Sequence, residues 1–348
     1  MSNFNEWEGS AVKNHHQALG FSDQDVLQMY DRMLAARRVD ERLWLLNRAG
    51  KIPFIVSCQG QEATQVGAAF ALNRERDYVA PYYRDIGFVL AWGMSVREMM
   101  LNNFAKAEDP NSGGRQMPGH FGYRKLRMLS HSSPVGTQMP HAVGIALAAK
   151  MRGDDIVSFV TFGEGTSNQG DFHEAANFAG VHRLPVIFLC ENNHYAISVG
   201  LKAQLACEHV ADRAAGYGMF GSRFDGNDPL AVYAAVKEAA DRAHRGEGPS
   251  LLEADCYRLK PHTSDDNDMS YRTKEEVEQA KVHDGVLTFA AYLREVGVLT
   301  AEKEREMEHT LALEIDEATD YAERAPFAGV ETMDRYVYAP DMQGGNDR

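Results

Sequence analysis

The chain has 348 residues, of which 36 are Lys or Arg and 50 are Asp or Glu, so its formal net charge is −14. This acidic balance argues against nucleic acid and anionic membranes as partners, and we find neither an apolar run of transmembrane length nor a basic-then-apolar leader at Met1. The four cysteines show no CxxC spacing, which predicts reduced thiols in a cytoplasmic protein.

The N-terminal part of the chain is expected to form structural elements that support the fold. Residues 1–20 are polar and irregular, and we expect an N-terminal arm that lies on a partner or frays. Ser22 is a candidate N-cap for a long amphipathic helix over 26–48, which Gly50 ends. The next segment predicts a short strand, a turn at 60–62 and a helix from Ala63.

The first candidate binding residues follow a short strand over 78–80. Tyr83 and Arg84 fall just beyond the end of this strand. An Arg side chain offers a planar fork of donors that matches a phosphate, and the neighbouring aromatic adds a hydroxyl donor and a wall. Taken alone, an Arg after a strand more often forms a surface ion pair, so both interpretations stay open at this point.

Two polar loops precede an uncharged helix. Residues 111–120 form a Gly-rich loop. The second loop brings hydroxyl, carbonyl and amide oxygens together, from Ser132, Pro134, Thr137 and Gln138. Such a cluster suits a monovalent cation or only a helix N-cap, and the residues alone favour the N-cap. The helix over 142–149 contains only Ala, Gly, Val, Ile and Leu, so it is either a tightly packed core element or a subunit contact.

The most informative stretch, 156–199, predicts a β-turn-α-turn-β unit. Its apolar run over 156–162 is too short for a helix and is typical of a strand buried on both faces of a parallel sheet. A helix follows, with apolar residues at helical spacing at Phe172, Ala175, Ala176 and Ala179. A second buried strand over 186–190 ends at Glu191-Asn192-Asn193. Polar groups therefore gather where two parallel strands end, which is the usual ligand crevice of an open α/β sheet.

Glu164 and Asn193 are the informative pair of this unit. One carboxylate and one amide oxygen suit Mg2+, which takes few protein ligands and completes its shell with phosphate and water. Gly163 and Gly165 let backbone N–H groups approach an anion, and the helix expected from about Thr166 points its N-terminus at the same place. A Gly-acid-Gly alone usually marks a turn. Here Gly-Glu-Gly follows one strand, and Asn-Asn follows the next strand after the intervening residues 166–191. This combination predicts a site for a metal-bridged diphosphate.

The remaining chain continues the alternation of helices and strands. It predicts a short helix over 211–215, a helix capped by Asp228 and ending near His244, and a strand over 250–257. His262 lies in the polar loop that follows, where a His is normally incidental. Residues 274–325 predict three charged amphipathic helices, over 275–282, 284–296 and 301–324. The middle one has an apolar packing stripe: Val286, Leu287, Phe289, Tyr292 and Leu293.

These elements predict an α/β fold with a doubly wound, mainly parallel sheet and helices on both faces. We expect a single α/β domain over 21–340, whose C-terminal part at 274–325 is helical.

Four motifs in one order carry a family resemblance: the loop at 113–120, the turn at 132–140, the unit at 163–193 and the His262 loop. The unit resembles the thiamine-diphosphate motif, usually written Gly-Asp-Gly followed by Asn-Asn, with Glu164 in place of the Asp. Over about residues 15–340 the chain resembles the α chain of the thiamine-dependent decarboxylase of 2-oxoacid dehydrogenase complexes. The resemblance is strongest to the bacterial branched-chain type, with pyruvate and acetoin types next, and it implies a thiamine-diphosphate-binding fold.

The resemblance also implies roles for individual residues. The Mg2+ ligands would be Glu164, Asn193 and the backbone carbonyl of Tyr195. The cofactor would be held by two groups of residues, which are Tyr83, Arg84, Gly163, Gly165 and Thr166 at the diphosphate, and Ser133 and Val135 at the aminopyrimidine. Ser132, Pro134, Thr137 and Gln138 match a K+ site of branched-chain members.

The resemblance also implies roles for His262 and Glu191. His262 matches an active-site residue near the diphosphate that faces the reacting carbons and donates a hydrogen bond or a proton. Glu191 stands where mammalian branched-chain members have an Arg, so we expect a less basic phosphate clamp to which Arg258 contributes.

The implied activity is oxidative decarboxylation of branched-chain 2-oxoacids, with transfer of the acyl group to a lipoyl acyltransferase core. The family's activating glutamate lies on a separate β chain, and two α and two β chains assemble around the cofactor. This chain should therefore hold half a site. A pyruvate or acetoin enzyme and a non-catalytic scaffold chain are the alternatives.

Overall fold

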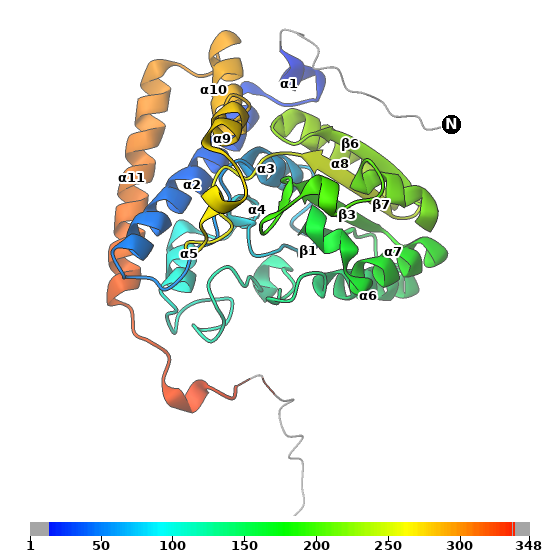
Figure 1. The fold of residues 1–348 in the computed structure, drawn as a ribbon, viewed down its shortest axis with the longest axis horizontal. Helices are drawn as coiled ribbons and strands as arrows, with labels where there is room; N and C mark the ends of the chain where they lie inside the picture. The colour runs from blue at the N-terminus through cyan, green and yellow to red at the C-terminus, as the bar shows by residue number, and fades with distance from the viewer. Residues whose placement is uncertain (1–13, 336, 338–348) are drawn as a thin grey trace, which may run out of the picture.

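A five-stranded parallel sheet forms the centre of the computed structural model, which describes residues 14–335 and 337 (Figure 1). The strand order is β1-β2-β3-β7-β6, and every pair in it is parallel. The strands are β1 (Tyr78–Ala80), β2 (Ser158–Gly163), β3 (Val186–Asn192), β6 (Phe220–Asp225) and β7 (Ser250–Asp255). A separate two-stranded hairpin joins β4 (Tyr195–Ala196) and β5 (Val199–Gly200). The doubly wound parallel sheet expected from the sequence is confirmed.

The sheet separates two apolar cores because successive strand residues point to opposite faces. Phe159, Ile187 and Leu252 join the larger core, whereas the next residues along two of these strands, Val160 and Phe188, join the smaller one. Burial on both faces explains why these strands read as continuous apolar runs in the sequence.

Helices cover both faces (Figure 1). The smaller core lies under α6 (Gln138–Arg152) and α7 (Gly170–His182). The larger core includes residues of α2 (Asp23–Arg48), α3 (Glu62–Phe70), α4 (Ile86–Ala91), α5 (Val96–Asn103), α8 (Pro229–His244), α10 (Gly285–Glu295) and α11 (Ala301–Arg324). Two short helices, α1 (His15–Ala18) and α9 (Lys274–Lys281), complete the set of α-helices among the described residues. The single domain over 21–340 stays a proposal, supported by both cores sharing one sheet.

Capping residues set several helix starts as expected. The Ser22 side chain accepts from the Asp25 N–H in a full capping box, and the Asp228 side chain accepts from the Leu230 N–H at 2.9 Å. The three C-terminal helices lie within one or two residues of their expected bounds. Leu287 is the exception in the packing stripe of α10, because its side chain is 61% exposed.

One other expectation is wrong. The segment before Gly60 forms no strand and instead donates and accepts loop hydrogen bonds, such as Leu259 N to Gln59 O at 3.0 Å. The N-terminal arm stays a prediction; within it, the buried His16 ring bonds the Tyr292 hydroxyl of α10 at 2.7 Å. Residues 1–13 lie outside the described part of the chain.

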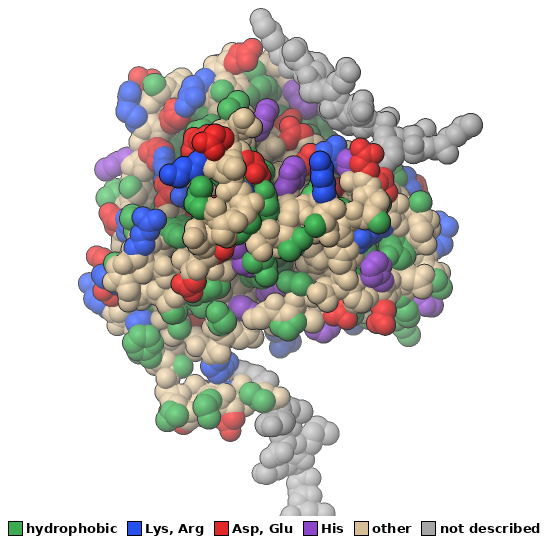
Figure 2. All heavy atoms as spheres, viewed as in Figure 1, with side chains coloured by type: hydrophobic (Ala, Val, Ile, Leu, Met, Phe, Trp, Pro, Cys, Tyr) green, Lys and Arg blue, Asp and Glu red, His purple; other side chains and the backbone are tan. Residues whose placement is uncertain are grey.

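Charged side chains of both signs are interspersed over the face shown in Figure 2. Within residues 14–335, no helix combines the length and apolar character that crossing a membrane requires.

Candidate functional site

A cavity of about 570 Å³ lies where the strands of the sheet end. Its walls come from the segments after β1, β2 and β3, and from the loop after β7. Twelve of the predicted residues line it: Tyr83, Arg84, Ser133, Pro134, Val135, Gly163, Glu164, Gly165, Thr166, Asn193, Tyr195 and His262. The predicted residues Ser132, Thr137, Gln138 and Arg258 do not line it. The sheet therefore brings together side chains that are far apart in the sequence.

Glu164 is a buried carboxyl group with neutral partners. It is 1% exposed and accepts from the Gln204 amide at 3.1 Å and from the backbone N–H of Asn193 at 3.2 Å. Burial raises its pKa above the ordinary value, and these hydrogen bonds oppose the rise. A buried carboxylate without an ion-pair partner at its hydrogen-bonding atoms fits an absent cation.

The surrounding donor set fits Mg2+ better than a softer metal. Among the described residues, no group of three His, Cys, Asp or Glu side chains converges on one point. A metal at Glu164 would therefore be bound by one carboxylate, the Asn193 amide oxygen, a backbone carbonyl and oxygens from outside the chain. This is the mixed oxygen set that Mg2+ takes at phosphate sites.

Arg258 supports the loop that carries the third predicted ligand. Its guanidinium is 1% exposed and donates to the carbonyls of Tyr195 at 3.1 Å and Ile197 at 2.7 Å. Ile197 has a φ of 57°, in the left-handed region, and its side chain is 58% exposed on the cavity wall. Direct contact of Arg258 with a diphosphate stays a prediction, and the geometry favours support of the 195–197 loop.

Arg84 offers one donor that the protein leaves open. It is 1% exposed; its Nη1 donates to the Ser57 carbonyl at 2.7 Å and its Nη2 to the His262 carbonyl at 3.2 Å. Its buried Nε has no hydrogen-bond partner among the described residues. Burying an unpaired charged donor is costly, so this N–H fits an absent acceptor such as a phosphate oxygen.

His262 is held as a neutral donor. Burial, and then the positive charges of Arg84 and Arg258, lower its pKa to about 3. Its Nδ1 lies 3.2 Å from Nη2 of Arg84, which can only donate, so Nδ1 accepts and the ring proton sits on Nε2. In this structure His262 can therefore donate a hydrogen bond from Nε2, rather than a proton from an imidazolium.

Glu191 does not face the cavity. It is fully buried behind it, where its Oε2 accepts from the amides of Gln61 at 2.5 Å and Gln65 at 3.1 Å. The neighbouring Asp85 is also fully buried; burial, and then the charge of Glu191, raise the pKa of Asp85 well above its usual value. Burial raises the pKa of Glu191 as well, against the hydrogen bonds that it accepts.

Gly163 and Gly165 differ in how much space a side chain would have at each position. A Cβ on Gly165 would lie 2.5 Å from the Cβ of Ala196, so a side chain there would push the β4–β5 hairpin away. A Cβ on Gly163 would meet nothing within 4 Å. The helix start expected near Thr166 is wrong, because residues 164–168 form a 3-10 turn and α7 begins at Gly170.

Three of the four predicted K+ ligands come together. The Ser132 hydroxyl lies 3.1 Å from the Pro134 carbonyl and 2.5 Å from the Thr137 hydroxyl. The N-cap alternative is wrong, since the Thr137 side chain caps no N–H of α6. Gln138 donates from Nε2 to the Thr161 carbonyl at 3.1 Å, and its buried Oε1 has no partner in the described chain.

Sequence reasoning missed part of the cavity wall. His120 lines the cavity, and its Nε2 lies 2.6 Å from the Ser133 hydroxyl, which orients a predicted cofactor contact. An apolar wall is formed by Phe54, Val56, Met117 and Ile197. The only signal for His120 was its place at the end of the Gly-rich loop, and the apolar side chains gave none.

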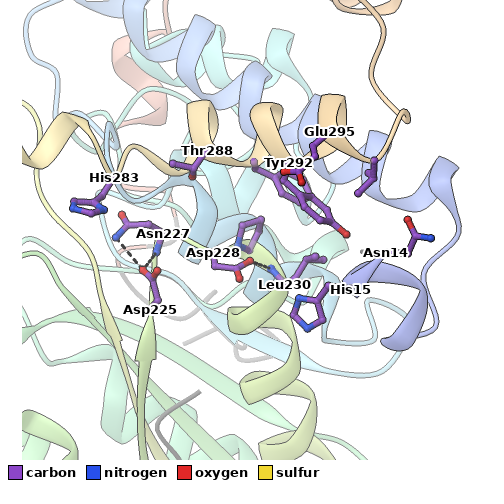
Figure 3. Close-up of a pocket in the computed structure, with 13 residues that line it drawn as sticks. Asn14, His15, Asp225, Asn227, Asp228, Leu230, His283, Thr288, Tyr292 and Glu295 are labelled. Atoms are coloured by element: carbon purple, nitrogen blue, oxygen red, sulfur yellow. Dashed lines mark hydrogen bonds between the residues drawn. The ribbon is translucent and has the colours of Figure 1, made fainter. Parts of the chain in front are cut away.

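A second cavity, of about 510 Å³, lies beyond the end of β6 (Figure 3). Two of its three acidic side chains, Asp225 and Asp228, already accept hydrogen bonds from backbone N–H groups around it. Asp225 accepts from the Asn227 N–H at 2.8 Å, and Asp228 caps α8. None of the predicted site residues lines this cavity. It therefore gives no reason to move the candidate site away from Glu164.

Comparisons with known proteins cover nearly the whole chain. Residues 30–331 match the family model described as "Dehydrogenase E1 component". The chain is 64% identical to the 2-oxoisovalerate dehydrogenase subunit alpha of Bacillus subtilis over 326 residues, which cover 94% of this chain and 99% of that one. It is 35% identical to the 3-methyl-2-oxobutanoate dehydrogenase subunit alpha of Mycobacterium tuberculosis, over 96% of this chain and 88% of that one. It is 36% identical to the pyruvate dehydrogenase E1 component subunit alpha of Bacillus subtilis, over 95% of this chain and 86% of that one.

Proposed function

Because this chain belongs to the dehydrogenase E1 component family, we propose that it is the α subunit of a branched-chain 2-oxoacid dehydrogenase decarboxylase. The observation that carries the substrate class is the 64% identity to a 2-oxoisovalerate dehydrogenase subunit over nearly the whole of both chains. Identity to a pyruvate dehydrogenase subunit is 36%, so pyruvate is the weaker alternative. The buried Glu164 beside a large cavity argues against a non-catalytic scaffold chain.

The family implies thiamine diphosphate, which when bound supplies the electron sink for loss of CO2. We propose that Glu164, Asn193 and the Tyr195 carbonyl hold Mg2+ at its diphosphate. The support is the buried Glu164 carboxylate, whose hydrogen-bond partners are both neutral, and the lack of a His, Cys, Asp or Glu cluster suited to a softer metal among the described residues. For K+ we propose Ser132, Pro134, Thr137 and Gln138, supported by the converging oxygens of the first three.

The side chains of this chain would hold and orient the cofactor. Arg84 would donate from its open Nε to the diphosphate, beside Tyr83, Gly163, Gly165 and Thr166. Ser133, held by His120, and the backbone of Val135 would contact the aminopyrimidine. His262 would present its Nε2–H toward the reacting atoms, where a positioned donor stabilises developing charge.

Partners follow from the subunit role. We propose a β chain that supplies the activating glutamate, an assembly of two α and two β chains, and a lipoyl acyltransferase core as acyl acceptor. We also propose a cytoplasmic location. Its support is that Cys58, Cys190, Cys207 and Cys256 are all free thiols in the structure.

The deciding experiment is a decarboxylation assay of the co-expressed α and β chains on a panel of 2-oxoacids, with added thiamine diphosphate and Mg2+. We expect kcat/KM for 2-oxoisovalerate to exceed that for pyruvate. A preference for pyruvate or acetoin would overturn the substrate class and leave the cofactor site intact. Glu164→Ala should lose cofactor retention without losing the fold, and wild-type affinity for thiamine diphosphate in this variant would overturn the metal assignment.

A further inference from the structure

The Asn193 side chain has two ends of similar shape and opposite chemistry. Its Oδ1 can bind a cation, whereas its NH2 group can only donate and would repel one. Rotation of the amide by half a turn exchanges the two ends with little steric cost. Whether Asn193 serves as a metal ligand therefore depends on what fixes this rotation.

A buried chain of side chains reaches Asn193 from behind the cavity. The Asn193 Nδ2 donates to Oε1 of Gln61 at 2.9 Å, and the Gln61 Nε2 donates to Oε2 of Glu191 at 2.5 Å. Asn193 is 4% exposed, and Gln61 and Glu191 are fully buried. Water therefore does not compete for these bonds, and each group must be satisfied within the protein.

The direction of this chain follows from its far end. The Gln65 amide is fixed independently, because its Oε1 accepts from Gly87 N, and its Nε2 therefore donates to Oε2 of Glu191, which acts as an acceptor. Gln61 must then turn its NH2 group toward Glu191 and its oxygen toward Asn193. Asn193 in turn must present its NH2 group to Gln61, so its Oδ1 is the end turned away from Gln61 and accepts from the backbone N–H of Tyr195 at 3.3 Å. Both Asn193 and Tyr195 line the cavity.

We propose that Gln61 and Glu191 are positioning residues, which set the amide of Asn193 so that its oxygen faces the Mg2+ position. This proposal rests on the proposed function, because it assumes a metal at Glu164 and Asn193. It also gives Glu191 a role other than a missing member of the phosphate clamp. The orienting partners of metal ligands typically change metal affinity when they are removed.

The test is the Mg2+ affinity of the assembled α and β chains at saturating thiamine diphosphate. Affinity is read from the thermal unfolding midpoint as Mg2+ is titrated, so it needs no turnover. Gln61→Leu should weaken Mg2+ binding by about 10-fold to 100-fold, the usual cost of losing an orienting partner. The matched control is Gln65→Leu. Gln65 is equally buried and also donates to Glu191, but its own oxygen accepts from Gly87 N rather than from Asn193. The control should keep Mg2+ affinity within about twofold.

A second background separates orientation from general damage. An Asp at position 193 offers an oxygen whichever way it turns, so in the Asn193→Asp background Gln61→Leu should change Mg2+ affinity by no more than about twofold. An equal loss in both backgrounds would overturn the proposal. If Gln61→Leu does not fold, the Glu191→Gln and Glu191→Met variants test the proposal instead. Glu191→Gln keeps an acceptor for Gln61 and should keep its Mg2+ affinity, whereas Glu191→Met has no such acceptor and should lose Mg2+ affinity. Equal affinities of these two would also overturn it.

The same titration separates failure of this proposal from failure of the proposed function. If Glu164→Ala binds Mg2+ as tightly as the wild type, the metal is not at this site and the proposed function fails. If Glu164→Ala loses Mg2+ while Gln61→Leu keeps it, only the positioning role fails.

Discussion

Arg37 joins three helices through buried ion pairs, and its removal should be costly. Its Nε donates to Glu62 at 2.6 Å, and Nη1 and Nη2 donate to the two oxygens of Asp284 at 2.8 and 2.9 Å. Arg37 is on α2, Glu62 begins α3, and Asp284 caps α10. Arg37→Met keeps most of the side chain's volume, but it leaves two buried carboxyl groups without their cation.

Breaking a buried ion pair from one side typically costs about 3–5 kcal/mol, because the remaining charge is uncompensated. Unfolding entropy of about 2.1 cal/mol/K per residue gives about 0.7 kcal/mol/K for a chain of this length. The midpoint of thermal unfolding should therefore fall by about 4–7 °C in Arg37→Met.

The neighbouring Arg38 provides the control. It also pairs with two carboxylates, Glu41 and Glu308, but its side chain is 39% exposed. Exposed pairs contribute about 0–1 kcal/mol, so Arg38→Met should shift the midpoint by less than about 2 °C. Both variants are compared by thermal unfolding of the assembled enzyme at one scan rate, with urea unfolding as a check. Equal shifts for the two variants would refute the distinction between buried and exposed pairs here.

Three further predictions concern the site itself. Without cofactor, the His262 imidazole should stay neutral from pH 8 to pH 5 in NMR of labelled histidine, because its pKa is lowered to about 3. Since the pKa of this group is higher in the unfolded chain, its contribution to stability is present above about pH 6.5 and is lost as the pH falls. Titration of His262 near pH 6.5 in the folded protein would contradict this. His262→Ala should retain the cofactor but lose about 10²–10⁴-fold in acyl transfer to lipoyl, measured as overall complex activity, whereas a change of only a few-fold would make His262 an incidental loop residue. The α chain alone, shown by mass spectrometry to lack any partner, should bind thiamine diphosphate weakly and decarboxylate nothing; robust turnover would rule out the split site.

The sequence predicted the central unit well because its signals are local. Strands buried on both faces form continuous apolar runs, and capping residues such as Ser22 and Asp228 mark helix starts within a few positions. The convergence of Glu164 and Asn193 followed from one rule about parallel strand ends. These features need no knowledge of distant contacts.

The parts that could not be predicted depend on contacts across the chain. Gln61 and Glu191 are 130 positions apart, and nothing local in the sequence indicates that their side chains meet. The extended segment before Gly60 has the apolar character of a strand, but it pairs with the loop after β7 instead of joining the sheet. Position 60 shows how tight this packing is, since a Cβ there would lie 1.9 Å from the Tyr257 carbonyl oxygen.

At Ile197, backbone strain is set against the apolar wall of the cavity. A β-branched residue in this conformation costs about 1–3 kcal/mol, which the surrounding structure, including the Arg258 bond to its carbonyl, must offset. Gly or Asn would relieve that cost, so selection for thermostability alone should favour them at residue 197. Either would also remove an apolar side chain from the cavity wall. Variants stabilised at this residue are therefore expected to have a smaller apolar wall around the cavity.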